Sequence, residues 1–230
     1  MKRMIKRNSG RSNMYNCILF DMDGTLVNSY EGIYHAYRVT MEKLGRPFGG
    51  EAFVRRAIGA PLPWVFQHLC RMEEDDVSQA VRYYRSYYAE KGKHQASVYN
   101  GMANTLSRLK KAGCYLATAT LKKEIFAREM LKELGLFSCF DVVYGADEEG
   151  RLTKADLIRK CMEAAGAAAG DTILVGDSPF DADGAAEAGT AFLAVTYGFG
   201  FRDREAAQAK GASLIADTPA EIAALLLANR

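Results

Sequence analysis

The stretch ILFDMDGTL at residues 18–26 decides how the rest of this sequence is interpreted. A short apolar run ends in two carboxylates, Asp21 and Asp23, and a glycine and a hydroxyl residue follow at once. In an extended backbone, residues two positions apart point to the same side, so both acids face one way and Met22 faces the other. Acids at the carboxyl end of a strand lie where open α/β sheets bind their ligands. Because like charges repel unless a metal ion or a shared proton compensates them, this pair predicts a functional site.

Length, charge and composition limit the classes of function. With 230 residues, the chain is long enough for one large domain or for a core with an insert. Its formal net charge of +2 is too small to indicate nucleic-acid binding, and much of the positive excess lies in residues 1–11. Residues 1–14 lack the apolar stretch of a signal peptide, so we predict that they form a basic, disordered leader.

The cysteines and the hydropathy of the chain indicate a reducing compartment. The five cysteines are scattered and form no CxxC pair, so neither a zinc site nor a disulfide framework is indicated. No window approaches the ~18 consecutive apolar residues of a membrane span. We therefore expect a soluble, cytoplasmic protein that binds neither membranes nor nucleic acid, as a monomer or a loose homodimer.

Strand patterns alternate with helix patterns from about residue 100 onward. Helix-period apolar residues separate the strand patterns, as they do over residues 154–165. This alternation predicts an α/β fold with a doubly wound, mostly parallel, Rossmann-like sheet. The runs typical of buried strands are residues 114–119, 140–144, 172–176, 190–195 and 213–216.

Residues 28–98 interrupt this alternation. Helical stripes of aromatic and aliphatic residues lie at 30–44 and 77–88, and no convincing strand lies between them. We predict a helical insert over 28–98 that separates two parts of the core, residues 15–27 and 99–230. An insert at this point would cover the strand ends as a lid does. We interpret the aromatic stripes as the packing of a small bundle, the alternative being a surface that stacks bases.

Three later segments are predicted to reach the same edge of the sheet as the carboxylate pair. A strand ends at Thr118–Thr120, the sequence GDSPFD follows another strand at residues 176–181, and Lys154 opens a helix. A cation in the first turn opposes the helix dipole, so Lys154 indicates an anion nearby. Ser178 and Asp181 have capping-box spacing, which makes a structural role the alternative for Asp181.

In this order the four segments resemble the motifs of the haloacid dehalogenase (HAD) superfamily. The insert after the first motif resembles that of the subfamily with a helical cap, and the phosphoglycolate phosphatase-like branch is the most similar. The resemblance runs from about residue 16 to the end of the chain. It implies a HAD-like core with an inserted α-helical cap. It also implies a Mg²⁺-dependent phosphatase that hydrolyses the phosphate monoester of a small molecule through an aspartyl-phosphate.

The resemblance implies a role for each acidic residue. Asp21 would be the nucleophile, and Asp23 would protonate the leaving oxygen and then deprotonate the attacking water. Mg²⁺ would be held by Asp21, Asp177 and a backbone carbonyl near Asp23. Asp181 would be a direct ligand of the metal or a support of the site. Because dehalogenating members lack the second acid, Asp23 favours phosphate-ester hydrolysis or a mutase.

Phosphate contacts are implied for Thr120, Leu121 and Lys154. Thr118 is the alternative to Thr120 on the same side of the strand, but Lys122 and the next helix follow Thr120 at the family's spacing. Leu121 replaces the small polar residue that the family usually carries at this position.

Substrate choice is expected to depend on the cap, because the core recognises only the phosphoryl group. Arg55 and Arg56 precede a turn at residues 58–61 that resembles the substrate-facing loop of such caps. An arginine there could pair with a substrate carboxylate, as phosphoglycolate would require. His68 lies near Trp64 in the sequence, and we interpret it as packed rather than catalytic.

Other functions stay open at this point. Within the superfamily, a 5′-nucleotidase or a sugar-phosphate mutase would use the same motifs. A metal- and phosphate-binding regulator without turnover would use the same pocket, although such a protein has no need of the leaving-group acid Asp23.

Overall fold

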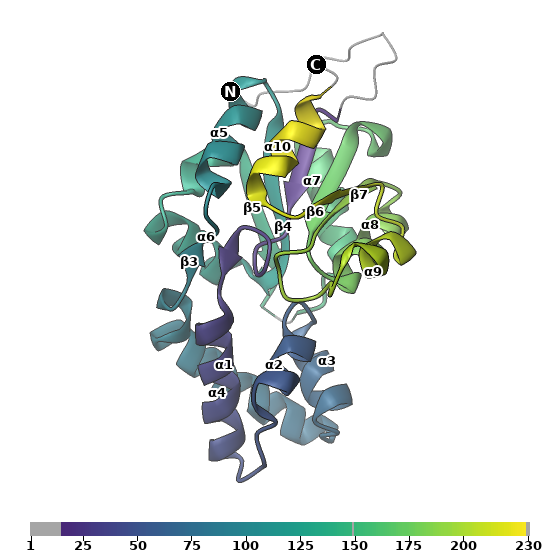
Figure 1. Cartoon of the computed structure of the whole chain (residues 1–230). Helices are drawn as coiled ribbons and strands as arrows, with labels where there is room; N and C mark the ends of the chain where they lie inside the picture. The colour runs from purple at the N-terminus through teal and green to yellow at the C-terminus, as the bar shows by residue number, and fades with distance from the viewer. Residues whose placement is uncertain (1–14, 149, 229–230) are drawn as a thin grey trace.

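The computed structural model describes residues 15–148 and 150–228 (Figure 1). Its centre is a parallel sheet with the strand order β5-β4-β1-β6-β7-β8. The α/β fold with a mostly parallel sheet is therefore confirmed, whereas the predicted leader, residues 1–14, lies outside the described residues. The strands are β1 (Cys17–Phe20), β4 (Tyr115–Lys123), β5 (Val142–Ala146), β6 (Thr172–Gly176), β7 (Ala191–Val195) and β8 (Leu214–Ala216).

Helices cover both faces of the sheet because the strand residues alternate between two apolar cores. Ile18 and Phe20 of β1 belong to the core under α5, α6 and α10, whereas Cys17 and Leu19 belong to the core under α7, α8 and α9. Among the described residues, no helix is both long and apolar enough to cross a membrane. The helices are α5 (Met102–Lys111), α6 (Glu124–Glu133), α7 (Lys154–Ala165), α8 (Pro179–Ala188), α9 (Arg204–Ala209) and α10 (Pro219–Leu227).

A second group of helices lies between the short strands β2 (Val27–Asn28) and β3 (Ser97–Val98). Figure 1 shows α1 to α4 gathered at one end of the molecule, beyond the sheet. Their aromatic stripes pack on each other, with the ring centroid of Tyr37 4.7 Å from that of Tyr84 and 5.7 Å from that of Phe66. The elements are α1 (Tyr30–Lys43), α2 (Gly50–Ala57), α3 (Leu62–Trp64), η1 (Val65–Leu69), α4 (Glu74–Glu90) and η2 (Gly92–His94).

β1 is the strand from which the order of the sheet grows to both sides. The next strand of the sheet along the chain, β4, pairs with one side of β1, and β6 pairs with the other. Such a switch leaves a crevice at the carboxyl ends of the strands, where α/β sheets bind their ligands. The antiparallel pairing of β2 with β3 then brings both ends of the helical segment to this crevice.

A close backbone contact fixes the start of α1 against η2. A Cβ atom on Gly32 would lie only 2.1 Å from the carbonyl oxygen of Gly92, which is closer than real Cβ atoms approach any atom. Glycine at position 32 therefore sets how closely these two ends of the helical segment approach each other.

We expect Gly32→Ala to lower the free energy of unfolding by about 1–3 kcal/mol, because the added methyl group forces two backbone segments apart. Gly170→Ala is the matched control, since a Cβ on Gly170 meets no atom within 4 Å and its φ is not positive. Urea denaturation of both variants measures the difference. Equal stability of the two variants would contradict the tight contact at Gly32.

Candidate active site

The turn after β1 positions the carboxylate pair. The N–H of Asp21 still donates to the carbonyl oxygen of Val175 at 2.8 Å. The chain then bends, and the N–H of Gly24 donates to the carbonyl oxygen of Val27 at 2.9 Å. Gly24 has a φ of 85°, and a Cβ there would lie 2.3 Å from Oδ2 of Asp177. Glycine is required here for both its positive φ and its small size.

Three buried carboxylates meet beside this turn. The side-chain oxygens of Asp21, Asp177 and Asp181 lie within 4.8 Å of one another. Asp177 directly follows β6, and its Oδ2 accepts hydrogen bonds from the N–H groups of Phe199 at 2.7 Å and Gly200 at 3.2 Å. These backbone contacts fix the orientation of the carboxylate without neutralising its charge.

Asp181 combines the two roles that the sequence left as alternatives. Its Oδ2 accepts from the N–H of Ser178 at 3.0 Å and from the Ser178 hydroxyl at 2.6 Å, which completes a capping box at the start of α8. Its Oδ1 lies 2.6 Å from the Nζ atom of Lys154, inside the carboxylate cluster. One oxygen therefore caps the helix while the other belongs to the site.

Lys154 is the cation at the centre of this cluster. It occupies the first turn of α7, behind a capping box formed by Thr153 and Asp156, and its side chain is only 5 % exposed. Its Nζ lies 2.6 Å from Oδ1 of Asp21 and donates to the carbonyl oxygen of Ala119 at 2.9 Å. The carboxylates thus supply the anion that compensates for the unfavourable position of a lysine at a helix start.

Burial and charge excess perturb the protonation of the cluster. Burial raises the pKa of Asp21 to about 6, against the lowering influence of Lys154. Burial and the neighbouring acids Asp181 and Asp21 raise the pKa of Asp177 well above its ordinary value. Burial alone would lower the pKa of Lys154, but Asp181 and Asp21 raise it, so the ammonium stays charged. One ammonium faces three carboxylates, and such a set of oxygen ligands fits a hard divalent cation.

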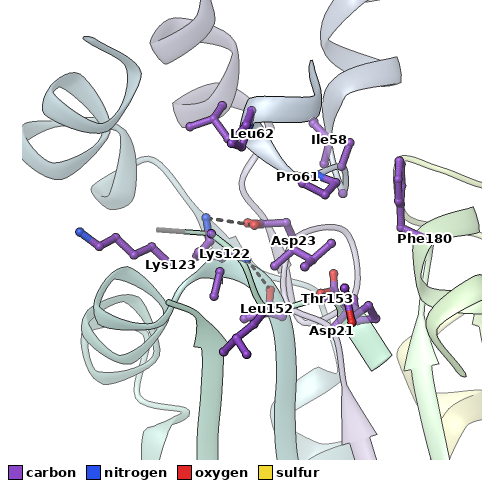
Figure 2. Close-up of a pocket in the computed structure, with 18 of the residues that line it drawn as sticks. Asp21, Asp23, Ile58, Pro61, Leu62, Lys122, Lys123, Leu152, Thr153 and Phe180 are labelled. Carbon is purple, nitrogen blue, oxygen red and sulfur yellow. Dashed lines mark hydrogen bonds and ion pairs between the residues drawn. The ribbon is translucent and has the colours of Figure 1, made fainter. Parts of the chain in front are cut away.

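Asp23 points away from this cluster toward different partners. The hydroxyl of Ser29 donates to its Oδ1 at 2.5 Å, and the Nζ of Lys122 lies 3.0 Å from its Oδ2 (Figure 2). Lys122 also donates to the hydroxyl of Tyr88 in α4 at 2.5 Å. From the sequence, Lys122 only helped to align Thr120 with the family's spacing and was not predicted to be a site residue. Its position two residues after Thr120 was the available signal.

The two threonines of β4 that were candidates for a phosphate contact, Thr118 and Thr120, lie in different surroundings. Thr120 and Leu121 line a cavity together with Asp21, Asp23 and Lys154. The hydroxyl of Thr118 instead donates to the carbonyl oxygen of Tyr144 at 3.3 Å, which occupies it in the sheet. The preference for Thr120 over Thr118 therefore agrees with their surroundings.

This cavity has a volume of about 390 Å³ and is lined by both parts of the chain. Figure 2 shows Ile58, Pro61 and Leu62 of the helical segment on one side and Phe180 of α8 on another. Apolar side chains thus face the carboxylate pair across the cavity, and charged groups lie at its base.

The structure does not place Arg55 or Arg56 on the cavity wall. Both are exposed, and the guanidinium of Arg55 lies 5.7 Å from the ring centroid of Tyr30. The buried residues of α2 are Val54 and Ala57, so the helix turns its arginines outward. The predicted contact of either arginine with a substrate is therefore not supported by this arrangement.

His68 also lies outside the cavity lining. It stacks on the ring of Trp64, with centroids 4.9 Å apart and an interplanar angle of 15°. Its Nδ1 lies 3.1 Å from the carbonyl oxygen of the same tryptophan. His68 is exposed, so it stacks on Trp64 at the surface and is not buried in the core as a packed histidine would be.

Comparisons with known proteins assign the family. The family described as haloacid dehalogenase-like hydrolase matches residues 18–195. A 5′-nucleotidase from Pseudomonas aeruginosa is 34 % identical over 82 % of this chain and 86 % of its own length. A phosphoglycolate phosphatase from Pseudomonas syringae is also 34 % identical, over 79 % of this chain and 70 % of its own. The crystal structure of a predicted phosphatase from Clostridium acetobutylicum has a TM-score of 0.89 and 33 % identity, covering 94 % of this chain and 99 % of that one.

The chain therefore belongs to the haloacid dehalogenase-like hydrolase family, as its motifs predict. Its relatives and structural neighbours identify it as a phosphatase.

We expect Gly184→Ala to reduce phosphate release by about tenfold to hundredfold, because displacement of a catalytic group by about 1 Å costs this much. A Cβ on Gly184 in α8 would lie 2.4 Å from Cγ and 2.6 Å from Cβ of Lys154, so the lysine must move. Gly170→Ala serves as the control. Full activity of Gly184→Ala in steady-state assays would show that the position of Lys154 is not critical.

Proposed function

We propose that this phosphatase is Mg²⁺-dependent and hydrolyses a phosphate monoester of a small metabolite through an aspartyl-phosphate. The observation that carries the proposal is a carboxylate pair in the lining of a cavity, with Lys154 and an acidic cluster against the first carboxylate. The cavity volume of about 390 Å³ is near the lower end of the ~300–1,000 Å³ typical of small-molecule sites. This size suits a metabolite rather than a macromolecular ester.

Asp21 is the proposed nucleophile. Its attack on phosphorus forms the aspartyl-phosphate and breaks the bond to the leaving oxygen, which divides one difficult step into two easier ones. An anionic phosphate must be neutralised before a carboxylate can approach it. Lys154 lies at hydrogen-bond distance from Asp21 and would contact a phosphate oxygen there, and Thr120 lines the same part of the cavity.

Asp23 is the proposed general acid and base. Its proton passes to the leaving alcohol oxygen in the first step and is recovered from the attacking water in the second. Ser29 and Lys122 each contact one oxygen of this carboxylate. They hold the side chain beside the cavity, so that it meets the leaving group rather than the metal ligands.

Asp21, Asp177 and Asp181 would hold the Mg²⁺ ion. Their fit rests on the charge imbalance of the cluster, in which three buried carboxylates share the single ammonium of Lys154. Bound there, the ion supplies positive charge that offsets the carboxylates and the phosphate oxygens. The sequence also predicted a backbone carbonyl near Asp23 as a ligand, whereas the Asp23 side chain itself faces Lys122.

Phosphoglycolate is the proposed substrate, and a nucleoside monophosphate is the second candidate. The relative named phosphoglycolate phosphatase supports the first, and the relative named 5′-nucleotidase supports the second. Phe126 and Phe180 in the cavity lining favour the second candidate, because aromatic rings can stack on a base.

We expect Asp21→Asn to abolish phosphate release while the fold is kept, because the amide cannot form the phosphoenzyme. Asp23→Asn should lower kcat by about 10²–10⁴-fold, which is the usual contribution of a general acid. The assay uses phosphoglycolate, nucleoside monophosphates and hexose phosphates, each with Mg²⁺ and with EDTA. Hydrolysis retained by Asp21→Asn would exclude the covalent mechanism.

The pKa of Asp21 also predicts how Mg²⁺ stabilises the protein. Because this pKa is raised from 3.8 to about 6, the metal-free folded state binds the proton more tightly than the unfolded chain does. The free energy of unfolding should therefore fall as the pH rises through this window. Above this pH range the buried Asp21 carboxylate is ionised, and a bound cation then stabilises the folded state most.

We accordingly expect Mg²⁺ to raise Tm more at about pH 7.5 than at about pH 5, where protons compete for Asp21. Differential scanning fluorimetry with Mg²⁺ and with EDTA measures this. Asp177→Asn is the control and should lose the Mg²⁺ effect at both pH values. An equal Mg²⁺ shift at the two pH values would contradict the assignment of Asp21 as a ligand.

A further inference from the structure

The ammonium of Lys122 is buried beside the proposed general acid, and it has so far been assigned only the positioning of Asp23. Its side chain is only 6 % exposed and lines the cavity. Its Nζ lies 3.0 Å from Oδ2 of Asp23 and 4.3 Å from the ring centroid of Tyr88. Removing an ammonium from water costs several kcal/mol, which its contacts with Asp23 and Tyr88 offset only in part.

We propose that Lys122 binds a carboxylate on the leaving alcohol and so determines which esters this phosphatase prefers. This inference rests on the proposed function. Asp23 must come within about 2.8 Å of the leaving oxygen to donate its proton. Because the Nζ of Lys122 lies 3.0 Å from Oδ2 of Asp23, it lies within about 6 Å of a leaving oxygen that Oδ2 protonates. A carboxylate on the carbon next to the ester oxygen falls within this reach, whereas one at the far end of a long chain does not.

Three further cations of the cavity lining, Arg85, Lys123 and Lys154, are engaged elsewhere, and a fourth, Arg151, is exposed. Arg85 donates to the carbonyl oxygen of Glu148 at 2.8 Å, and the Nζ of Lys123 lies 2.5 Å from the Glu148 carboxylate. Lys154 lies in the acidic cluster, where the phosphoryl group binds. Within the part of the chain that the structure describes, Lys122 is the lysine that contacts the proposed general acid.

Tyr88 offers a second contact to the same anion. Its hydroxyl accepts a hydrogen bond from Lys122, so its own hydrogen stays available to a substrate oxygen. Burial raises the pKa of Tyr88 to about 12, which keeps the phenol neutral and able to donate. Because Tyr88 lies in α4 and Lys122 in β4, the bound carboxylate would contact both the helical segment and the sheet.

The test compares Lys122→Met with the wild-type enzyme on two esters, phosphoglycolate and ethyl phosphate, which lacks the carboxylate. We expect the ratio of their kcat/KM values to fall by about tenfold to hundredfold, the usual effect of losing a charge-assisted hydrogen bond. Tyr88→Phe should lower the ratio by a smaller factor. Lys123→Met is the matched control and should keep the ratio, because Figure 2 shows Lys123 directed away from Asp23.

The possible outcomes separate the two proposals. An equal loss on both esters in Lys122→Met would overturn this inference, since it would mean that the lysine only positions Asp23. A wild-type enzyme that hydrolyses both esters equally well would overturn it without any variant, even if Lys122→Met does not fold. Absence of phosphate release from every ester, by folded wild-type protein with Mg²⁺, would instead contradict the proposed function, and the inference would fall with it.

Discussion

The arrangement of this molecule depends on an excess of buried negative charge at the carboxyl end of β1. Asp21, Asp177 and Asp181 share Lys154, and Asp23 pairs with Lys122. Buried ion pairs contribute little net stability, yet removal of one partner typically costs about 3–5 kcal/mol. Such a cluster is therefore poorly explained as a means of stabilising the fold. The proposed reaction, in which a divalent cation and a phosphoryl group would occupy the same edge of the sheet, accounts for it.

The order of the strands in the sheet brings these charged residues together from distant parts of the chain. β1 lies in the middle of the sheet, and the chain leaves it to opposite sides, so the ends of β4 and β6 flank Asp21. The helical segment enters and leaves beside the same edge through the pairing of β2 with β3. In the proposed reaction the core would supply the groups that act on phosphorus. The helical segment supplies apolar residues of the cavity wall, which would face the leaving group.

Features that depend on local sequence patterns could be predicted from the sequence. The direction in which a helix or strand turns a particular side chain could not. Strand and helix alternation, the carboxylate pair and the oddly placed Lys154 can be identified from neighbouring residues alone. The outward direction of Arg55 and Arg56 could not, because it follows from the packing of Val54 and Ala57 against the rest of the helical segment. Lys122 was not identified because a lysine is usually solvated. This lysine is buried in the cavity because β4 extends to residue 123.

Two neighbouring strands offer their functional groups with the same spacing. β1 is followed by Asp21 and Asp23, and β4 ends with Thr120 and Lys122, each pair two residues apart. Asp21 and Thr120 line the part of the cavity near Lys154, whereas Asp23 and Lys122 contact each other farther along it. In each pair the first residue would act on the phosphoryl group and the second on the leaving alcohol. Substrate choice would then not depend on the helical segment alone, because β4 would bind the phosphate through Thr120 and the leaving alcohol through Lys122, two residues further on.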